Sequence, residues 1–403
     1  MDNVTHAFVG AAMAECALPR DATSRTRLAV VCAGVIAANA PDVDLLYTSI
    51  TEEPIGYLLH HRGHSHTLPG LAVIGLLIWS SLRLLPWTRT ALRGTEARVN
   101  VLIAAALISH LLMDAANSYG THLLYPFSSR WTYGDAVFVL EPWLWTMLGA
   151  TLALNAVRHF WRAVVVLLTL FLVGALVSVG LLQLGVLAVL LAAVGAAAFV
   201  TRAWDRKKRA AVVLMATAAV FLVMPGVSRL AKAEARRALV AVDTGELVDI
   251  VSDVNPGVPW CWTVLTLQKA SDAPNDALIA RRATLSLLPG IWPARSCASA
   301  RLSTQWSTDV AGSDGAVWHR TWRINVGELR ALAASNCRVS AWLQFGRAPY
   351  VANGWIADLR FEHPIAQNFT PTAINGSSPG CPAHVTHWEW PRWDVLGSPV
   401  DRP

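Results

Sequence analysis

The amino-acid sequence predicts a multi-pass α-helical membrane domain of about eight helices, followed by a mainly β domain. Hydrophobic residues make up 54% of the 403-residue chain, charged residues only 15%, and the mean hydropathy is +0.40. Long runs without charge fill residues 1–226, whereas residues 227–403 contain alternating stretches separated by Gly and Pro. This composition is typical of a protein that lies partly in a membrane.

Apolar stretches in residues 1–226 account for the predicted helices. The run from 163 to 201 lacks any charged residue and is long enough for two spans of about 20 residues each, with a bend between Gly180 and Gly185. The first stretch is short for a span, so we expect other helices to shelter it. The predicted helices cover residues 4–18, 28–40, 67–82, 99–113, 142–157, 163–180, 185–201 and 210–224, the last ending at Pro225-Gly226.

Loop charge predicts the orientation of these helices. Arg and Lys concentrate in alternate connections, at residues 19–27, 83–98, 156–162 and 202–209. Basic loops stay in the cytoplasm, so we expect the other connections and the C-terminal domain to lie outside it, in a bacterial inner membrane. The chain starts without a cationic signal region, so we expect its N-terminus to be retained. The pI near 9.2 then reflects loop charge, and no nucleic-acid partner is expected.

The residues after 226 have the pattern of a β domain. Residues 260–267, 317–324 and 338–345 are rich in Trp, Thr and Val and alternate with period two, which predicts antiparallel strands. Residues 229–239 are expected to form a short helix that leads into them. The tryptophans are interpreted as core; a lid over the site, or a surface for lipid or glycan, is the alternative.

Cysteine usage agrees with an extracytoplasmic C-terminal domain. Four of the six cysteines lie there, an even number compatible with two disulfides in an oxidising compartment. The spacing leaves their pairing open. These cysteines are Cys261, Cys297, Cys337 and Cys381.

A dense histidine cluster occupies residues 60–66, with four imidazoles in seven positions. Imidazole is the commonest metal ligand in proteins. Upstream, Asp42 and Asp44 follow a proline, so both carboxylates can face one cation; an acidic loop that ends a helix is the alternative. Downstream, His110 and Asp114 are four residues apart and share one helix face; a hydrogen bond within that helix is the alternative.

The predicted orientation brings these groups to the same external end of the helices. Unrelated histidines would not be expected to sort this way, so we predict a divalent metal site with zinc as the favoured ion. The number of candidates exceeds the needs of one tetrahedral zinc and favours a binuclear centre, or one metal with supporting residues. The predicted ligands are His6, Asp42, Asp44, His61, His66, His110, Asp114 and His122.

The same residues carry a resemblance to a known family, over residues 1–145. Their order resembles the bacterial family of membrane-bound, predicted metal-dependent hydrolases, some of which are LexA-regulated. The resemblance implies a metal-dependent hydrolase; a remoter likeness is to zinc-dependent phospholipase C. The matching motifs are Thr5-His6, Pro41-Asp42-Val43-Asp44, His61-Arg62-Gly63-His64-Ser65-His66, His110-Leu111-Leu112-Met113-Asp114, Tyr119-Gly120 and Pro126-Phe127-Ser128.

Two positions depart from the family pattern. His64 occupies a place that is variable in the family, and Glu141-Pro142 replaces its usual Asp-Pro. Arg62, His64 and Glu141 are the predicted catalytic residues. Two roles stay open for Arg62: stabilising a phosphoryl charge through its fork of donors, or pairing with the carboxylates at positions 42 and 44.

These observations predict an integral membrane hydrolase that cleaves an ester or phosphoester in a lipid-like or envelope substrate. Three or more His and Asp ligands that leave room for water would lower its pKa and polarise the scissile group. A metal or proton transporter is one alternative, and would place His and Asp at mid-span. A non-catalytic envelope-binding protein is the other. Membrane lipids are expected partners.

Overall fold

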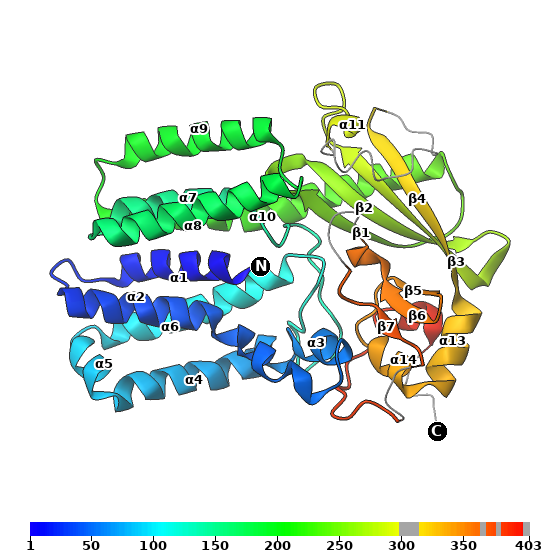
Figure 1. Ribbon diagram of the computed structural model, residues 1–403, viewed down its shortest axis with the longest axis horizontal. Coiled ribbons are helices and arrows are strands. Elements are labelled where there is room, and N and C mark those ends of the chain that lie inside the picture. The colour runs from blue at the N-terminus through cyan, green and yellow to red at the C-terminus, as the bar shows by residue number, and fades with distance from the viewer. Residues whose placement is uncertain (298–313, 363–367, 376–379, 398–403) are drawn as a thin grey trace.

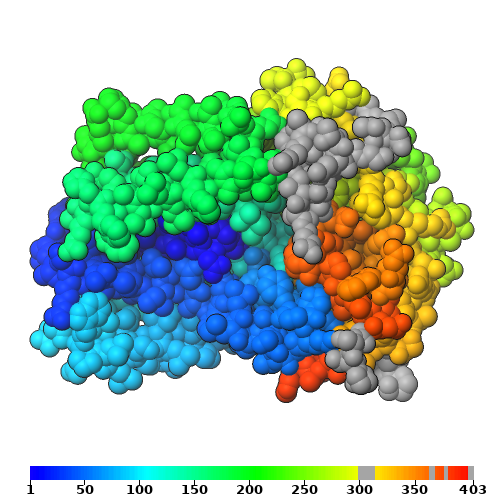
Figure 2. Space-filling model, in the orientation of Figure 1, coloured from blue at the N-terminus to red at the C-terminus, as the bar shows by residue number. Residues whose placement is uncertain are grey.

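A computed structural model describes residues 1–297, 314–362, 368–375 and 380–397. A layer of long helices lies beside a C-terminal domain that contains the β-sheets (Figure 1). The space-filling view shows the two parts in contact at one end of the helices (Figure 2). Apolar helices followed by a sheet-rich domain were the predicted order, and the structure confirms it.

Apolar helices make up the N-terminal part. Five described helices are long and apolar enough to cross a membrane, or six if Ile55–His66 and Leu68–Leu84, bent by 71°, form one broken span. The predicted count of about eight is not confirmed, since α1 and α7 have only 15 and 14 residues. The main helices are α1 (Asn3–Ala17), α2 (Ser24–Asn39), α4 (Leu68–Leu84), α6 (Glu96–Ala115), α7 (Pro142–Asn155), α8 (His159–Ser178), α9 (Leu184–Thr201) and α10 (Arg206–Val240).

Shorter elements fill the two ends of the helical layer. The basic connections, including α5 (Pro86–Ala91), lie together at the end remote from the C-terminal domain (Figure 1). This sorting agrees with the loop-charge argument, and the side of the membrane that each end faces stays a prediction. The end near the C-terminal domain holds η1 (Ala40–Leu46), η2 (Thr48–Ile50), α3 (Ile55–His60) and η3 (His64–His66).

Helices α1 and α2 pack backbone against backbone. A Cβ atom added at Gly10 would lie 2.4 Å from the Gly34 carbonyl oxygen, and one added at Gly34 would lie 2.5 Å from the Gly10 oxygen. Only glycine permits this approach. The contact fixes His6, one turn before Gly10, close to the segment that continues α2.

Helix α10 does not end at Pro225 as predicted. It runs for 35 residues through that proline, or about 52 Å at 1.5 Å per residue, which exceeds the ~30 Å of a membrane core. An interior proline costs a helix about 3 kcal/mol. Burial of Ala231, Ala235 and Leu239 in one cluster with Trp262 and other strand residues offsets that cost. The predicted exit helix is therefore the last part of α10.

Antiparallel strands build the C-terminal domain. The larger sheet has the order β1-β2-β3-β4, and the smaller has the order β5-β6-β7. The predicted strands at 260–267 and 317–324 lie within β2 and β4. The strands are β1 (Leu247–Asn255), β2 (Val258–Ala270), β3 (Ala273–Ser286), β4 (Ala316–Asn325), β5 (Pro349–Ala352), β6 (Trp355–Asp358) and β7 (Thr372–Ala373); the helices are α11 (Ala294–Cys297), α13 (Val326–Ser335), α14 (Cys337–Trp342), η4 (Leu359–Phe361) and α15 (Trp393–Leu396).

The predicted strand at 338–345 is wrong. Its first part is the helix α14, which the Asn336 side chain caps by accepting hydrogen bonds from two backbone N–H groups. Val339, Trp342 and Phe345 recur every three residues and are fully buried, so helical packing overrides the alternating pattern. Trp262, Trp342 and Trp390 are among the most buried side chains, and these tryptophans form core as interpreted.

Two disulfides connect distant parts of this domain. Cys261 pairs with Cys297, and Cys337 pairs with Cys381, with Cα–Cα distances of 5.4 Å in each. The first links β2 to α11, and the second links the start of α14 to the C-terminal segment. All four predicted cysteines are used, and the pairing that the sequence left open is now assigned.

A buried ionic network joins the two parts of the chain. Asp135, in the loop before α7, receives two hydrogen bonds of 2.8 and 2.9 Å from Arg347 and one of 2.6 Å from Lys232 on α10. The same guanidinium binds Asp249 on β1 at 2.8 Å. Since Arg347 and Asp135 are almost fully buried, each needs the other to stay satisfied. The network fixes the C-terminal domain against the loop between α6 and α7.

We expect Arg347→Ala to lower the free energy of unfolding by about 3–5 kcal/mol, because it removes the bidentate cation from buried Asp135, which is left with Lys232, and the nearer cation from Asp249. Guanidinium unfolding followed by tryptophan fluorescence in detergent measures this. The control is Arg323→Ala, which removes an equally bidentate but exposed pair with Asp272 and should cost little. Equal losses in the two variants would contradict the role of the network.

Candidate metal centre

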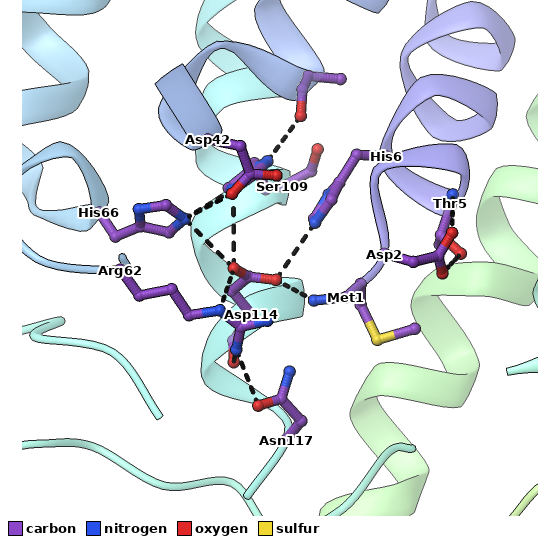
Figure 3. Close-up of polar contacts among 12 residues, drawn as sticks. Met1, Asp2, Thr5, His6, Asp42, Arg62, His66, Ser109, Asp114 and Asn117 are labelled. Atoms are coloured by element: carbon purple, nitrogen blue, oxygen red, sulfur yellow. Dashed lines mark hydrogen bonds and ion pairs between the residues drawn. The ribbon is translucent and has the colours of Figure 1, made fainter. Parts of the chain in front are cut away.

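Four predicted ligands converge at the end of the helices near the C-terminal domain. Figure 3 shows three of them, Asp42, His66 and Asp114, pointing toward one another. Asp42 comes from η1, His66 from η3, and His110 and Asp114 from the last turns of α6. One ligand atom from each lies within 4.8 Å of all the others. The four side chains are at most 8% exposed.

Hydrogen bonds at the far side of each imidazole determine which nitrogen faces the cluster. His110 Nδ1 lies 2.6 Å from the backbone carbonyl of Ala38, which can only accept, so this nitrogen carries the proton. His66 Nδ1 lies 3.1 Å from an Asp44 carboxylate oxygen and 2.9 Å from the Ser65 hydroxyl, which can donate or accept. The Nε2 atom of His110 therefore presents a lone pair to the cluster, and the Nε2 atom of His66 also faces it, as in metal sites whose ligands are oriented from behind.

The two Nε2 atoms face each other. His66 Nε2 and His110 Nε2 are 2.9 Å apart, which is a hydrogen-bond distance when one of them carries a proton. The carboxylates surround them: an Asp42 oxygen lies 3.3 Å and an Asp114 oxygen 3.3 Å from His66 Nε2. The carboxylates repel one another unless positive charge lies between them, as a proton on an imidazole or as a metal cation at the centre.

A second set of ligand atoms adjoins the first and shares Asp42. It contains Asp42, Asp44 and His61, again with one atom of each within 4.8 Å of the others. His61 Nδ1 lies 3.1 Å from Asp44 Oδ1, and the backbone N–H of Arg62 donates to Asp44 Oδ2 at 2.9 Å. Arg62 has φ of 61°, a left-handed conformation that non-glycine residues seldom adopt and that functional sites often hold.

His6 lies beside the first set. Its ring stacks on His110 at a centroid distance of 3.8 Å, and its Nε2 is 3.2 Å from Asp114. Its Nδ1 is buried and has no hydrogen-bond partner among the described residues. The Met1 amino group also contacts Asp114. His6 therefore contacts two of the candidate ligands, Asp114 and His110, and is not one of the four residues whose ligand atoms converge.

The Arg62 side chain pairs with a carboxylate that the sequence did not suggest. Its Nε lies 2.9 Å from Asp114 Oδ2, and its Nη1 donates to Asn117 Oδ1 at 2.9 Å. Asp44 contacts Arg62 through the backbone N–H group of Arg62. Asn117 and Ser65, which donates to Asp44 at 2.6 Å, are supporting residues that the sequence analysis missed. Their polar side chains next to predicted ligands were the available signal.

Besides His6 and Arg62, three further predicted site residues lie outside both sets among the described residues. His64 is exposed and packs on Trp388 at 4.7 Å. His122 is buried between Trp388 and Trp131, at 3.6 and 4.1 Å, and burial lowers its pKa to about 3. Glu141 caps α7 and accepts from the backbone N–H of Gly257 at 3.1 Å. Packing and capping account for all three.

Comparison with known proteins covers the segment that holds every predicted ligand. Residues 1–187 match the model of the YdjM inner membrane protein family. The match confirms the family resemblance predicted from the motifs. The chain is also similar to the uncharacterized protein YfhP of Bacillus subtilis, 24% identical over 158 residues, which are 38% of this chain and 46% of that protein. No solved structure matches.

Residues 1–187, the segment that matches the YdjM model and is called the YdjM segment below, share a cavity of about 490 Å³ with the C-terminal domain. Asp42, the residue common to both ligand sets, lines it together with His61 and Arg62. The opposite wall comes from outside the YdjM match and includes Asp253 on β1 and Arg282 on β3. Sequence reasoning missed this wall, because it depends on docking between segments far apart in the chain.

The cavity wall is poorly hydrated. Burial raises the pKa of Asp253 to about 6 and lowers that of Arg282 to about 10. Apolar side chains form much of the remaining lining, which includes Leu45, Phe138, Leu140, Leu181, Val258, Phe361 and Phe369.

The buried carboxyl group of Glu141 should make the stability of the protein depend on pH. Burial raises its pKa from 4.5 to about 8. The folded protein therefore keeps this proton up to about pH 8, whereas the unfolded chain loses it near pH 4.5. Unfolding free energy should fall as pH rises through this window, by up to about 1.4 kcal/mol per pH unit.

We expect Glu141→Gln to flatten that pH dependence, since the amide keeps the acceptor for Gly257 and cannot ionise. Unfolding midpoints measured between pH 5 and 9 check this. Glu246→Gln, at an exposed ion pair with Lys269, is the matched control. An unchanged slope in Glu141→Gln would contradict the assignment.

Proposed function

We propose that this protein is an integral membrane hydrolase that uses a divalent metal centre to cleave an ester or phosphoester in a membrane-derived amphiphile. The observation that carries the proposal is the convergence of two imidazoles and two carboxylates, with one ligand atom of each within 4.8 Å of the others, in a buried position that adjoins a cavity. Two carboxylates beside two imidazole nitrogens 2.9 Å apart are a donor set that fits a divalent cation. The YdjM family match supports a membrane location.

The donor set fits a borderline divalent ion. Asp42, His66, His110 and Asp114 would hold it, and two imidazoles with two carboxylates suit zinc. A divalent ion there supplies Lewis-acid activation of water and of the scissile group. The second set, which shares Asp42, would accommodate a second ion in a binuclear centre.

The surrounding residues keep these donors in place. Asp44 orients the His66 ring, and Arg62 holds Asp114 through an ion pair of 2.9 Å. His61 lines the cavity with its Nδ1 against Asp44. With a single ion His61 is free to move a proton at its other nitrogen, and with two ions it is a ligand.

The cavity supports an amphiphilic substrate. Its ligand-bearing wall is polar, Arg282 can compensate a negative charge, and leucine, valine and phenylalanine side chains provide an apolar wall. The site lies at one end of the helices, where a headgroup would be and acyl chains would not. By the loop-charge argument this end faces the outside of the cell.

The position of the cluster counts against transport. A transport path places ionisable groups along the middle of the spans, whereas here they gather at one end. The apolar helices α8 and α9 between His159 and Thr201 carry Arg162 as their only Asp, Glu, Lys or Arg. A non-catalytic binding protein is an outcome that the experiment below separates.

Metal analysis by inductively coupled plasma mass spectrometry tests the proposal. The purified wild-type protein should hold one or two equivalents of a divalent transition metal. His66→Ala and Asp114→Ala should each retain less than a tenth of it, and should hydrolyse p-nitrophenyl ester or phosphoester probes at least 100-fold more slowly. His159→Ala, at the start of α8 and the opposite end of the helices, should match wild type.

Two results would contradict the proposed hydrolase function. Wild type without any metal above the level of the His66→Ala variant excludes the centre. Bound metal with no hydrolysis of any ester, phosphomonoester or phosphodiester probe retains the centre and favours a binding protein.

A further inference from the structure

Two hollows adjoin on the face formed by α4 and α6, at the basic end of the helices. The first, about 280 Å³, is lined by Arg83, Arg89 and Arg93. The second, about 520 Å³, runs along the two helices and has an almost wholly apolar lining. Trp79 and Asn100 line both, so the hollows are direct neighbours. Helices α4 and α5 form an outer edge of the helical layer (Figure 1).

The first hollow has the chemistry of an anion site. Its three arginines come from the end of α4, from α5 and from the turn after it, and Glu96 is its one acidic residue. None of the three arginines forms an ion pair with any described residue. Arg83 lies over the Trp79 ring at 5.4 Å. Convergent guanidinium groups without carboxylate partners match the charge and geometry of a phosphate.

The second hollow has the shape of a groove for a hydrocarbon chain. The small side chains of Ala72, Gly75 and Ala104 leave this space open. The largely buried side chains of Leu71 and Leu107 form part of its floor. From Leu68 to Trp79 the groove follows α4 over eleven residue-to-residue steps, or about 16 Å at 1.5 Å per step. One leaflet of a membrane core is about 15 Å thick, half of the ~30 Å total.

We propose that an anionic phospholipid binds here, with its phosphate among Arg83, Arg89 and Arg93 and one acyl chain in the groove. Charge complementarity, groove length and adjacency of the two hollows favour a lipid over a free phosphate or a protein partner. The arginine hollow lies at the opposite end of the helices from the metal ligands, so phosphate binding there does not depend on the proposed hydrolase activity. The groove ends at Leu68, two residues after His66, so the bound lipid braces the helix that follows this ligand.

Native mass spectrometry of the full chain in detergent micelles tests this, with dioleoylphosphatidylglycerol and dioleoylphosphatidylcholine as probes. Wild type should retain one phosphatidylglycerol in preference to phosphatidylcholine. Arg89→Gln with Arg93→Gln should weaken phosphatidylglycerol binding roughly 30-fold, at about a tenfold loss per 1.4 kcal/mol and about 1 kcal/mol per arginine. Arg20→Gln with Arg98→Gln removes two exposed arginines at the same end outside the pocket, and should leave binding unchanged.

Two further arms separate a seated lipid from adsorption to charge. Ala104→Phe fills the groove without altering charge and should weaken phosphatidylglycerol binding at least tenfold, while millimolar inorganic phosphate should not displace the lipid. The proposal is overturned by equal binding of the two lipids, by equal losses in both double arginine variants, or by full binding in Ala104→Phe. Unfolding midpoints of every variant without added lipid, close to wild type, show that lost binding is not lost folding.

Discussion

Electrostatic repulsion at the end of the helical layer is the constraint around which the site is built. Two imidazole Nε2 atoms, two carboxylates and the adjacent Asp44 gather in a space from which water is largely excluded. Such a group is costly unless positive charge is close. Arg62 supplies some of that charge through Asp114, and its strained backbone is held by the N–H bond to Asp44. A bound cation would supply the rest.

The rest of the fold serves to hold these charges together. Glycine contact between α1 and α2 brings His6 and η1 to one place, and the Ala38 carbonyl at the end of α2 sets the tautomer of His110. The C-terminal domain encloses the polar end, and the Asp135 network prevents it from moving away. Packing of Trp388 against His64 and His122 adds apolar contact between the domain and the loops of the YdjM segment.

Much of this could be predicted from the sequence, since hydrophobic runs and loop charge are local signals. They predicted the convergence of Asp42, His66, His110 and Asp114 at one end, which the geometry now describes at atomic scale. Features that depend on tertiary packing could not be predicted from the sequence. Alternation at 338–345 could not reveal a cap at Asn336, and a histidine motif could not reveal that His122 stacks between tryptophans. Pro225 could not reveal that its helix continues and packs on the sheet. The partner of Arg62 and the cavity wall at Asp253 depend on long-range contacts for which one sequence carries no signal.

The order of the two parts along the chain has a consequence for how the protein is made. The converging ligands all lie before residue 115, whereas the cavity beside Asp42 also needs strands and loops as late as Phe369. The ribosome therefore synthesises the candidate ligands before the segments that complete the cavity. A metal ion bound by these ligands during biosynthesis would face solvent on the cavity side until the C-terminal domain docks.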